Sequence, residues 1–246
     1  MLHEFSYHRP ASLDEALAFL SEHGPKTTVF SGGTDLFVNI RAGLAKPDHV
    51  LDLKRIPELH TLRWDGREGL TIGACVPVNE LLNHKDVATE FPVLIAAGRE
   101  LATHQLRNRA TVIGNIVTAS PCGDMSGPLY ILGGEAVLRN AGGERRVPLG
   151  EFITGVKTTL IKPDEIVTRI VVPPRWARAT GGYEKLKRIK GHDMGVVSVA
   201  MIRHATAIRC AIGSAAPTPV LLPDFSPNAS ADEVVRAARE MISPID

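Results

Sequence analysis

The segment Val29-Phe30-Ser31-Gly32-Gly33-Thr34-Asp35-Leu36 decides how the first part of this chain is interpreted. A short β-prone run ends at Phe30, two adjacent glycines follow, and an amphipathic helix is predicted from Leu36. Glycine lacks a Cβ and adopts positive φ, so backbone N–H groups in such a turn can converge on an anion. The start of the helix adds positive potential, which favours a diphosphate. An ordinary strand-to-helix turn without a ligand is the alternative.

The residues around this segment predict alternating strands and helices. One helix is predicted over Leu13 to Leu20, with a left-handed glycine cap at Gly24. A second helix, from Leu36 to Leu44, separates a strand at Thr27 to Phe30 from another at His49 to Leu53. Two strands joined through a helix predict a parallel pair with a right-handed crossover. The carboxylate of Asp35 would repel a phosphate, so we expect it to point away or to cap the helix.

A second segment, Thr111-Val112-Ile113-Gly114-Asn115, mixes small, polar and apolar residues. This mixture is not what an amphipathic helix or strand requires. It suits a second loop that approaches a phosphate. The alternative is a buried strand from Val112 to Val117 beside two solvated arginines, Arg107 and Arg109.

The rest of the chain predicts an α+β fold with a largely antiparallel second sheet. A hairpin is predicted within Ala136 to Leu149, and Pro173-Pro174 suggest a domain boundary. The other predicted strands are Leu70 to Gly73, Ile166 to Val172, Tyr183 to Leu186, Gly195 to Ile202 and Ala207 to Ile212, and further helices are predicted at Val87 to Thr103 and Ala231 to Met241.

Composition excludes several classes of function. Lys+Arg is 28 and Asp+Glu is 27, a net charge of 28 − 27 = +1, and aromatic residues are 5% of the 246 residues. The chain has neither the excess positive charge nor the many aromatic side chains for base stacking that a nucleic-acid-binding protein would be expected to have. No apolar run is long enough to span a membrane, and the N-terminus does not resemble a signal peptide. The three cysteines have no metal-ligand spacing, so reduced thiols in the cytoplasm are expected.

No acid–base or nucleophile motif is present. GxSxG and HExxH are absent, and the histidines are scattered along the chain. We therefore expect no catalytic side chain and no metal ligand, and a bound cofactor is expected to supply the chemistry.

Taken together, these segments resemble the FAD-binding (medium) subunit of the molybdenum hydroxylases, which include carbon monoxide dehydrogenase, xanthine dehydrogenase and 4-hydroxybenzoyl-CoA reductase-like enzymes. The two glycine segments are similar to the pyrophosphate loops of that family. The similarity covers nearly the whole chain and also includes Phe5 to Ala16, Gln105 to Pro121, Tyr183 to Leu186, Val197 to Ala200 and Ala215 to Val220.

The resemblance implies a two-part FAD-binding domain over residues 1–174, followed by a small C-terminal α/β domain over 175–246. The FAD-binding domain would combine a small parallel α/β piece, about 1–55, with a larger piece, 56–174, that has an antiparallel sheet. The family usually continues beyond the equivalent of Asp246, so a shortened C-terminal domain is expected.

The resemblance also implies which residues hold FAD. The two loops would bind the diphosphate, Leu101 and Val167 would make apolar contacts, and Asp124 and Lys185 would lie at the flavin or ribityl. The implied cofactor-binding residues are Val29, Phe30, Ser31, Gly32, Gly33, Thr34, Asp35, Leu36, Leu101, Thr111, Val112, Ile113, Gly114, Asn115, Asp124, Val167 and Lys185.

The function implied by the resemblance is electron transfer within a heterotrimeric molybdenum hydroxylase. Electrons would pass from a molybdopterin centre in a large partner subunit through two [2Fe-2S] clusters in a small partner subunit to the FAD of this chain. An external acceptor, such as NAD, a quinone or oxygen, would then be reduced. A stand-alone flavoenzyme is one alternative. A degenerate scaffold that no longer binds FAD is another, because Ile113 stands where the family usually has glycine and because the C-terminal domain is expected to be shortened. A β-branched residue such as isoleucine disfavours positive φ.

Overall fold

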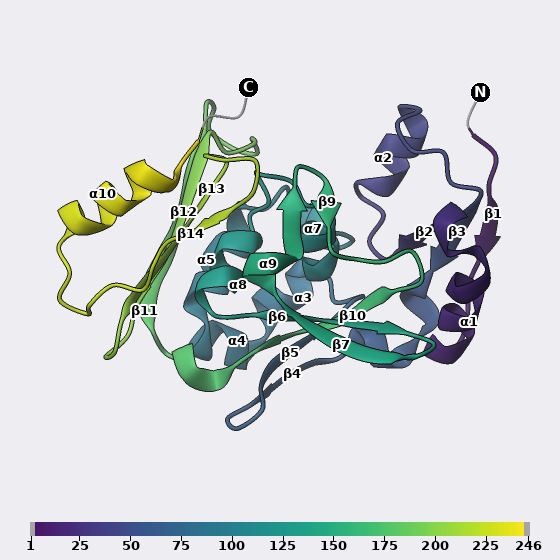
Figure 1. Ribbon diagram of the computed structural model, residues 1–246, viewed down its shortest axis with the longest axis horizontal. Helices are drawn as coiled ribbons and strands as arrows, with labels where there is room; N and C mark the ends of the chain where they lie inside the picture. Colours follow the sequence, from purple (N-terminus) through teal and green to yellow (C-terminus); the bar gives the residue numbers. More distant parts are fainter. Residues whose placement is uncertain (1–2, 244–246) are drawn as a thin grey trace.

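The computed structural model describes residues 3–243 and contains three main β-sheets with helices between and beside them. In Figure 1 a small sheet near the N-terminus, a central sheet and a C-terminal sheet follow one another along the longest axis of the molecule. Within the described residues, no helix is both long and apolar enough to cross a bilayer.

The N-terminal sheet is parallel, as the strand–helix–strand pattern predicts. Its strand order is β1-β3-β2, and both neighbouring pairs run parallel. The strands are β1 (Ser6–His8), β2 (Thr27–Phe30) and β3 (His49–Asp52), and the helices are α1 (Leu13–His23), η1 (Gly24–Lys26) and α2 (Leu36–Arg41).

The left-handed cap predicted at Gly24 is wrong. Gly24 has φ −45°, a right-handed helical value, because the chain continues directly into η1 with Pro25 in its first turn. Glycine is needed there for space: a Cβ at this position would lie 2.4 Å from the carbonyl oxygen of Pro163. Gly24 thus lets α1 pack closely against the loop before β10.

The central sheet is antiparallel and has the strand order β4-β5-β10-β6-β7. The predicted hairpin is confirmed as the β6–β7 pair, and β10 lies in the middle of the sheet. Its strands are β4 (Leu62–Asp65), β5 (Gly69–Gly73), β6 (Glu135–Asn140), β7 (Gly143–Pro148) and β10 (Ile166–Val172), and a small hairpin is formed by β8 (Ile153–Gly155) and β9 (Thr158–Thr159).

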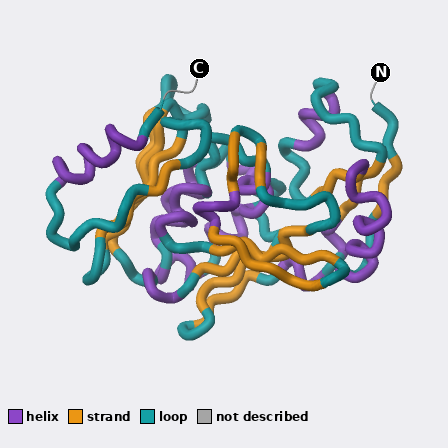
Figure 2. Tube along the Cα trace, viewed as in Figure 1, coloured by secondary structure: helices purple, strands orange, loops and turns teal. Residues whose placement is uncertain are grey.

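Short helices occupy the space between the central and C-terminal sheets, as Figure 2 shows. Helices α7 and α9 contact the central sheet, whereas α5 and α8 contact the C-terminal sheet. All the helices between residues 53 and 176, in this space and outside it, are η2 (Leu53–Arg55), η3 (Pro57–His60), α3 (Val78–Asn83), α4 (Lys85–Glu90), α5 (Pro92–Glu100), α6 (His104–Arg107), α7 (Val112–Val117), α8 (Ser126–Ile131), α9 (Leu149–Phe152) and η4 (Pro174–Trp176).

Two sequence-based assignments in this region are wrong. The single helix predicted over Val87 to Thr103 is two helices, α4 and α5, because Pro92 starts a new helix and disfavours helical geometry at Phe91. The strand considered for Val112 to Val117 is helix α7. Its N-terminus is capped by Thr111, whose hydroxyl oxygen accepts a bond from Gly114 N–H at 3.0 Å.

The C-terminal sheet is antiparallel, in the order β11-β12-β13-β14, and α10 packs on one of its faces. The predicted strands are present, although β11 begins three residues before the predicted start at Tyr183, and β12 and β13 pair as a hairpin. The elements are β11 (Thr180–Leu186), β12 (Val197–Arg203), β13 (Ile208–Gly213), β14 (Val220–Leu221) and α10 (Ala231–Met241).

An ion pair just before β10 makes stability depend on pH. Glu165 is buried and accepts bonds from Arg145 Nε at 2.6 Å and Nη2 at 2.7 Å. These bonds hold the pKa of Glu165 below its ordinary value of 4.5, although burial opposes them. A lowered carboxyl pKa stabilises the fold above the ordinary pKa, and this stabilisation is lost as pH falls through the folded pKa.

We expect Glu165→Gln to lower the free energy of unfolding by about 1–2 kcal/mol at neutral pH, since Arg145 is partly exposed. The difference from the unmodified chain should shrink as the pH falls from 4.5 through the lowered pKa of Glu165, which urea denaturation at several pH values would measure. Glu144→Gln is the matched control, because its pair with Arg169 is more exposed. A difference that stays constant with pH would contradict this assignment.

Candidate functional site

A cavity of about 930 Å³ lies where the N-terminal sheet meets the central part of the molecule. This volume is in the upper part of the range of ligand and cofactor pockets. Sixteen of the seventeen residues expected to hold FAD line it. The exception is Val112, which is fully buried in the core and whose N–H donates to the carbonyl oxygen of Val76 at 3.2 Å.

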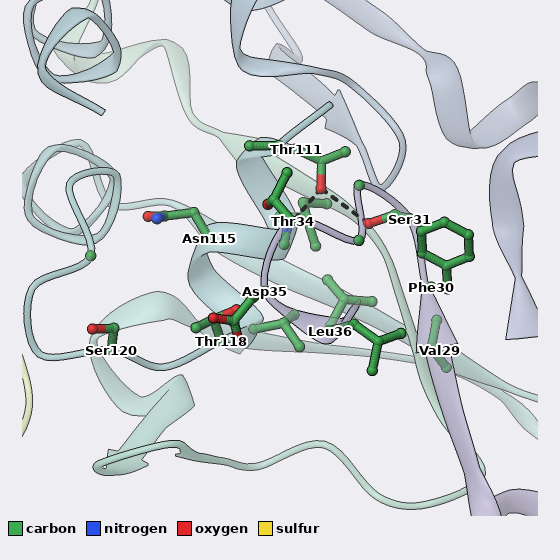
Figure 3. A pocket seen from close by; sticks show the side chains of 18 of the residues that line it. Val29, Phe30, Ser31, Thr34, Asp35, Leu36, Thr111, Asn115, Thr118 and Ser120 are labelled. Carbon is green, nitrogen blue, oxygen red and sulfur yellow. Dashed lines mark hydrogen bonds between the residues drawn. The ribbon is translucent and has the colours of Figure 1, made fainter. Parts of the chain in front are cut away.

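The two glycine segments meet at one wall of this cavity although they are 80 residues apart in sequence. The hydroxyl groups of Ser31 and Thr111 are hydrogen-bonded at 3.1 Å, as Figure 3 shows. A Cβ at Gly32 would lie 2.3 Å from the backbone oxygen of Arg109. Glycine at position 32 therefore allows the two segments to come into contact.

The first loop has free hydrogen-bond donors. Among residues 3–243, no protein acceptor receives the backbone N–H of Gly32, Gly33 or Thr34. Gly33 has φ +75°, which turns the chain at this point, and a Cβ there would collide with the ring of Phe30. Backbone N–H groups without partners on a cavity wall suit an anionic ligand such as a diphosphate.

The carboxylate of Asp35 does not cap α2, which was one of the two arrangements expected for it. It accepts weak bonds from Asn39 Nδ2 at 3.3 Å and Thr118 Oγ1 at 3.5 Å. Lys157 Nζ, at the tip of the β8–β9 hairpin, lies 3.8 Å from Asp35 Oδ2. Three neighbours thus hold this negative charge at the cavity wall, and Lys157 partly compensates for it.

Asp124 and Lys185 form an ion pair elsewhere on the cavity wall. Lys185 Nζ lies 2.9 Å from Asp124 Oδ1, and both side chains are almost fully buried. Tyr183 donates a bond of 2.7 Å from its hydroxyl to the same carboxylate oxygen. Burial raises the pKa of Asp124, and the bonds from Lys185 and Tyr183 act against this rise.

Apolar residues form another part of the wall. Leu101 and Val167 are each 6% exposed, and both contribute to the cavity as the resemblance implies. Ile113 is 4% exposed and lies in the first turn of α7. It adopts helical backbone geometry there, so its position does not require positive φ, and the cavity remains open beside it.

Several residues of this site are not predicted from the sequence. Thr118 and Lys157 line the cavity near Asp35, and Cys122 lines it near Asp124. Tyr183 is predicted only as part of a strand. Its two-residue spacing from Lys185 was a usable signal, because alternate residues of a strand lie on the same face.

Comparison with known proteins identifies the class to which this fold and site belong. Residues 3–175 match the family described as the FAD binding domain in molybdopterin dehydrogenase. The chain belongs to this family, and it is the FAD-binding medium subunit of an oxidoreductase of the molybdenum hydroxylase type. The predicted family, fold class and cofactor are thereby confirmed.

Individual relatives agree with this assignment. The chain is 34% identical over 220 residues to the carbon monoxide dehydrogenase medium chain of Hydrogenophaga pseudoflava, covering 87% of this chain and 76% of the relative. It is 29% identical to the putative xanthine dehydrogenase FAD-binding subunit of Escherichia coli, covering 87% and 75%. A solved structure of carbon monoxide dehydrogenase from Hydrogenophaga pseudoflava superposes with a TM-score of 0.91 at 31% identity, covering 100% of this chain and 90% of the other.

Proposed function

We propose that the two glycine segments bind the diphosphate of FAD and that the chain passes electrons from a partner subunit to an external acceptor. The observation that carries this proposal is the contact between Ser31 and Thr111, which brings the free N–H groups of the first loop to one wall of a large cavity. Backbone donors are suited to a diphosphate because they are fixed in place before the ligand binds.

Different residues of the cavity would contact different parts of FAD. Loop N–H groups would hold the phosphates, while Leu101, Ile113 and Val167 would exclude water from the flavin and ribityl chain. Asp124 and Lys185 would provide a buried pair of charges beside the flavin. Bound FAD would supply the ability to accept electrons and release them one or two at a time.

The proposed partners are a small subunit with [2Fe-2S] clusters and a large subunit with molybdopterin. The relatives support this arrangement, since the two named above are a medium chain and an FAD-binding subunit of larger enzymes. We also propose a cytoplasmic location, which agrees with the three free cysteines, Cys75, Cys122 and Cys210. The division into domains at residues 174 and 175 remains a proposal as well.

The scaffold alternative loses one of the two observations that motivated it. That observation was Ile113, but this side chain belongs to helix α7, and the cavity is open beside it. The stand-alone flavoenzyme has no corresponding support. It would be favoured if a small substrate bleached the flavin absorbance of the isolated chain.

Titration of the apoprotein with FAD tests the proposal directly. We expect saturable binding with one FAD per chain, quenching of flavin fluorescence and an increase in melting temperature. When the two partner subunits and the substrate are added, the flavin absorbance should bleach. Absence of both saturable binding and a thermal shift would overturn the FAD site. Bleaching that does not require the partners would overturn the electron-transfer role.

Charge at the diphosphate end of the cavity should affect FAD affinity in opposite directions at Asp35 and Lys157. Asp35→Asn should tighten FAD binding and Lys157→Gln should weaken it, each by about two- to fivefold, as is typical for partly exposed charges. Both effects should decrease at high ionic strength. Riboflavin, which has no phosphate, is the control ligand. Equal effects on riboflavin affinity would show that these residues do not act on the diphosphate.

A further inference from the structure

Tyr183 lies outside the cavity wall but is connected to it. Its side chain is 8% exposed, and its hydroxyl donates to Asp124 Oδ1 at 2.7 Å. Lys185, two residues further along β11, reaches both oxygens of the same carboxylate, at 2.9 Å and 3.2 Å. One carboxylate on the loop before α8 therefore joins two side chains of the C-terminal sheet.

The lysine of this arrangement is closely packed. A Cβ at Gly195 would lie 3.2 Å from Cε and 3.3 Å from Cγ of Lys185, so Gly195 packs closely against the lysine side chain. Tyr183 and Lys185 point to the same face of β11, where strand geometry keeps them in register. Asp124 therefore accepts bonds from two donors on the same face of one strand.

The charge balance of this network depends on Asp124. While Asp124 is ionised, it neutralises Lys185, and the wall carries no net charge from the pair. If Asp124 takes up a proton, the charge of Lys185 is no longer compensated. The phenol of Tyr183 favours the ionised carboxylate because it donates a hydrogen bond to it.

Other charges near Asp124 are already paired or more distant. Glu100, at the end of α5, acts on Asp124 through its negative charge, and its carboxylate is bonded to Lys187 Nζ at 2.7 Å. Lys187 follows Lys185 on the chain just after β11. The hydroxyl group of Ser198, on β12, lies beside Tyr183. Of these groups, Tyr183 is the neutral donor in direct contact with Asp124.

We infer that Tyr183 is a positioning residue which, through Asp124, sets the net charge that Asp124 and Lys185 present at the cavity wall. This inference rests on the proposed function, because its effect is measured as the affinity and midpoint potential of bound FAD. The C-terminal sheet then does more than cover the cavity: it controls the electrostatic environment of the cofactor. Tyr183 itself is not among the residues that line the cavity.

The test is Tyr183→Phe, which removes one oxygen and keeps the ring. FAD affinity and the midpoint potential of the bound flavin are measured against pH in the holoprotein. Loss of one hydrogen bond to a charged acceptor changes the proton affinity of Asp124 by about 10- to 100-fold. The pH at which protonation of Asp124 changes the FAD affinity and the midpoint potential should therefore rise by about one to two units. Below that pH the midpoint potential should be higher, because the positive charge of Lys185 is then uncompensated.

Two further variants separate this role from simple packing. Tyr130→Phe changes another buried tyrosine, on α8, and should leave both pH profiles unchanged. In an Asp124→Asn background, Tyr183→Phe should have no further effect on either profile. If Tyr183→Phe binds FAD with the pH profile of the unmodified chain, the inference is wrong. If the unmodified chain does not bind FAD, the proposed function fails instead.

Discussion

Gly32→Ala is expected to weaken FAD binding by about 10- to 100-fold, while the apoprotein still folds. The added Cβ would lie 2.3 Å from the backbone oxygen of Arg109, and a backbone atom cannot move aside as a flexible side chain can. Overpacking of this kind costs roughly 1–3 kcal/mol, which corresponds to the expected loss of affinity if the loops separate. Fluorescence titration with FAD gives the affinity, and circular dichroism of the apoprotein reports folding.

Gly66→Ala is the matched control for this prediction. Gly66 lies in the turn between β4 and β5 and does not adopt positive φ, and a Cβ added there would meet no atom within 4 Å. This variant should bind FAD with unchanged affinity. If Gly32→Ala also binds within twofold of the unmodified chain, contact between the two loops is not required for the cofactor.

Ile113→Gly is expected to lower the free energy of unfolding by about 3–5 kcal/mol and to leave FAD binding no tighter. Ile113 is 4% exposed in the first turn of α7, so its removal leaves a void beside Val112 and Ile116. Truncation of a buried isoleucine costs about 2–5 kcal/mol, and glycine inside a helix adds about 1 kcal/mol. Urea denaturation of the apoprotein measures the loss of stability.

Ile113→Val provides the comparison, with an expected cost of about 0.5–1.5 kcal/mol because only one methyl group is removed. The two substitutions should therefore be ordered by the volume that they remove. If Ile113→Gly bound FAD more tightly and lost little stability, residue 113 would belong to a phosphate-binding loop that needs glycine, not to a helix. The scaffold interpretation would then regain its support.

Sequence patterns were reliable where local and tertiary preferences agree. The parallel N-terminal strands, the β6–β7 hairpin and helix α10 follow from local periodicity and turn residues. Such patterns gave the wrong assignment where a short apolar run is compatible with both a strand and a helix. Val112 to Val117 has β-branched residues that favour a strand, but the cap at Thr111 and burial of one face make it a helix.

The sequence by itself determined the family, because several motifs in the same order resemble it, and that resemblance implied sixteen of the residues that line the cavity. Only the tertiary structure decided which polar and charged groups meet. The bond between Ser31 and Thr111, the Asp35–Lys157 pair and the contact of Tyr183 with Asp124 join residues 59 to 122 positions apart. Coulombic and hydrogen-bond energies depend on distances in space, and no periodicity along the chain encodes those distances.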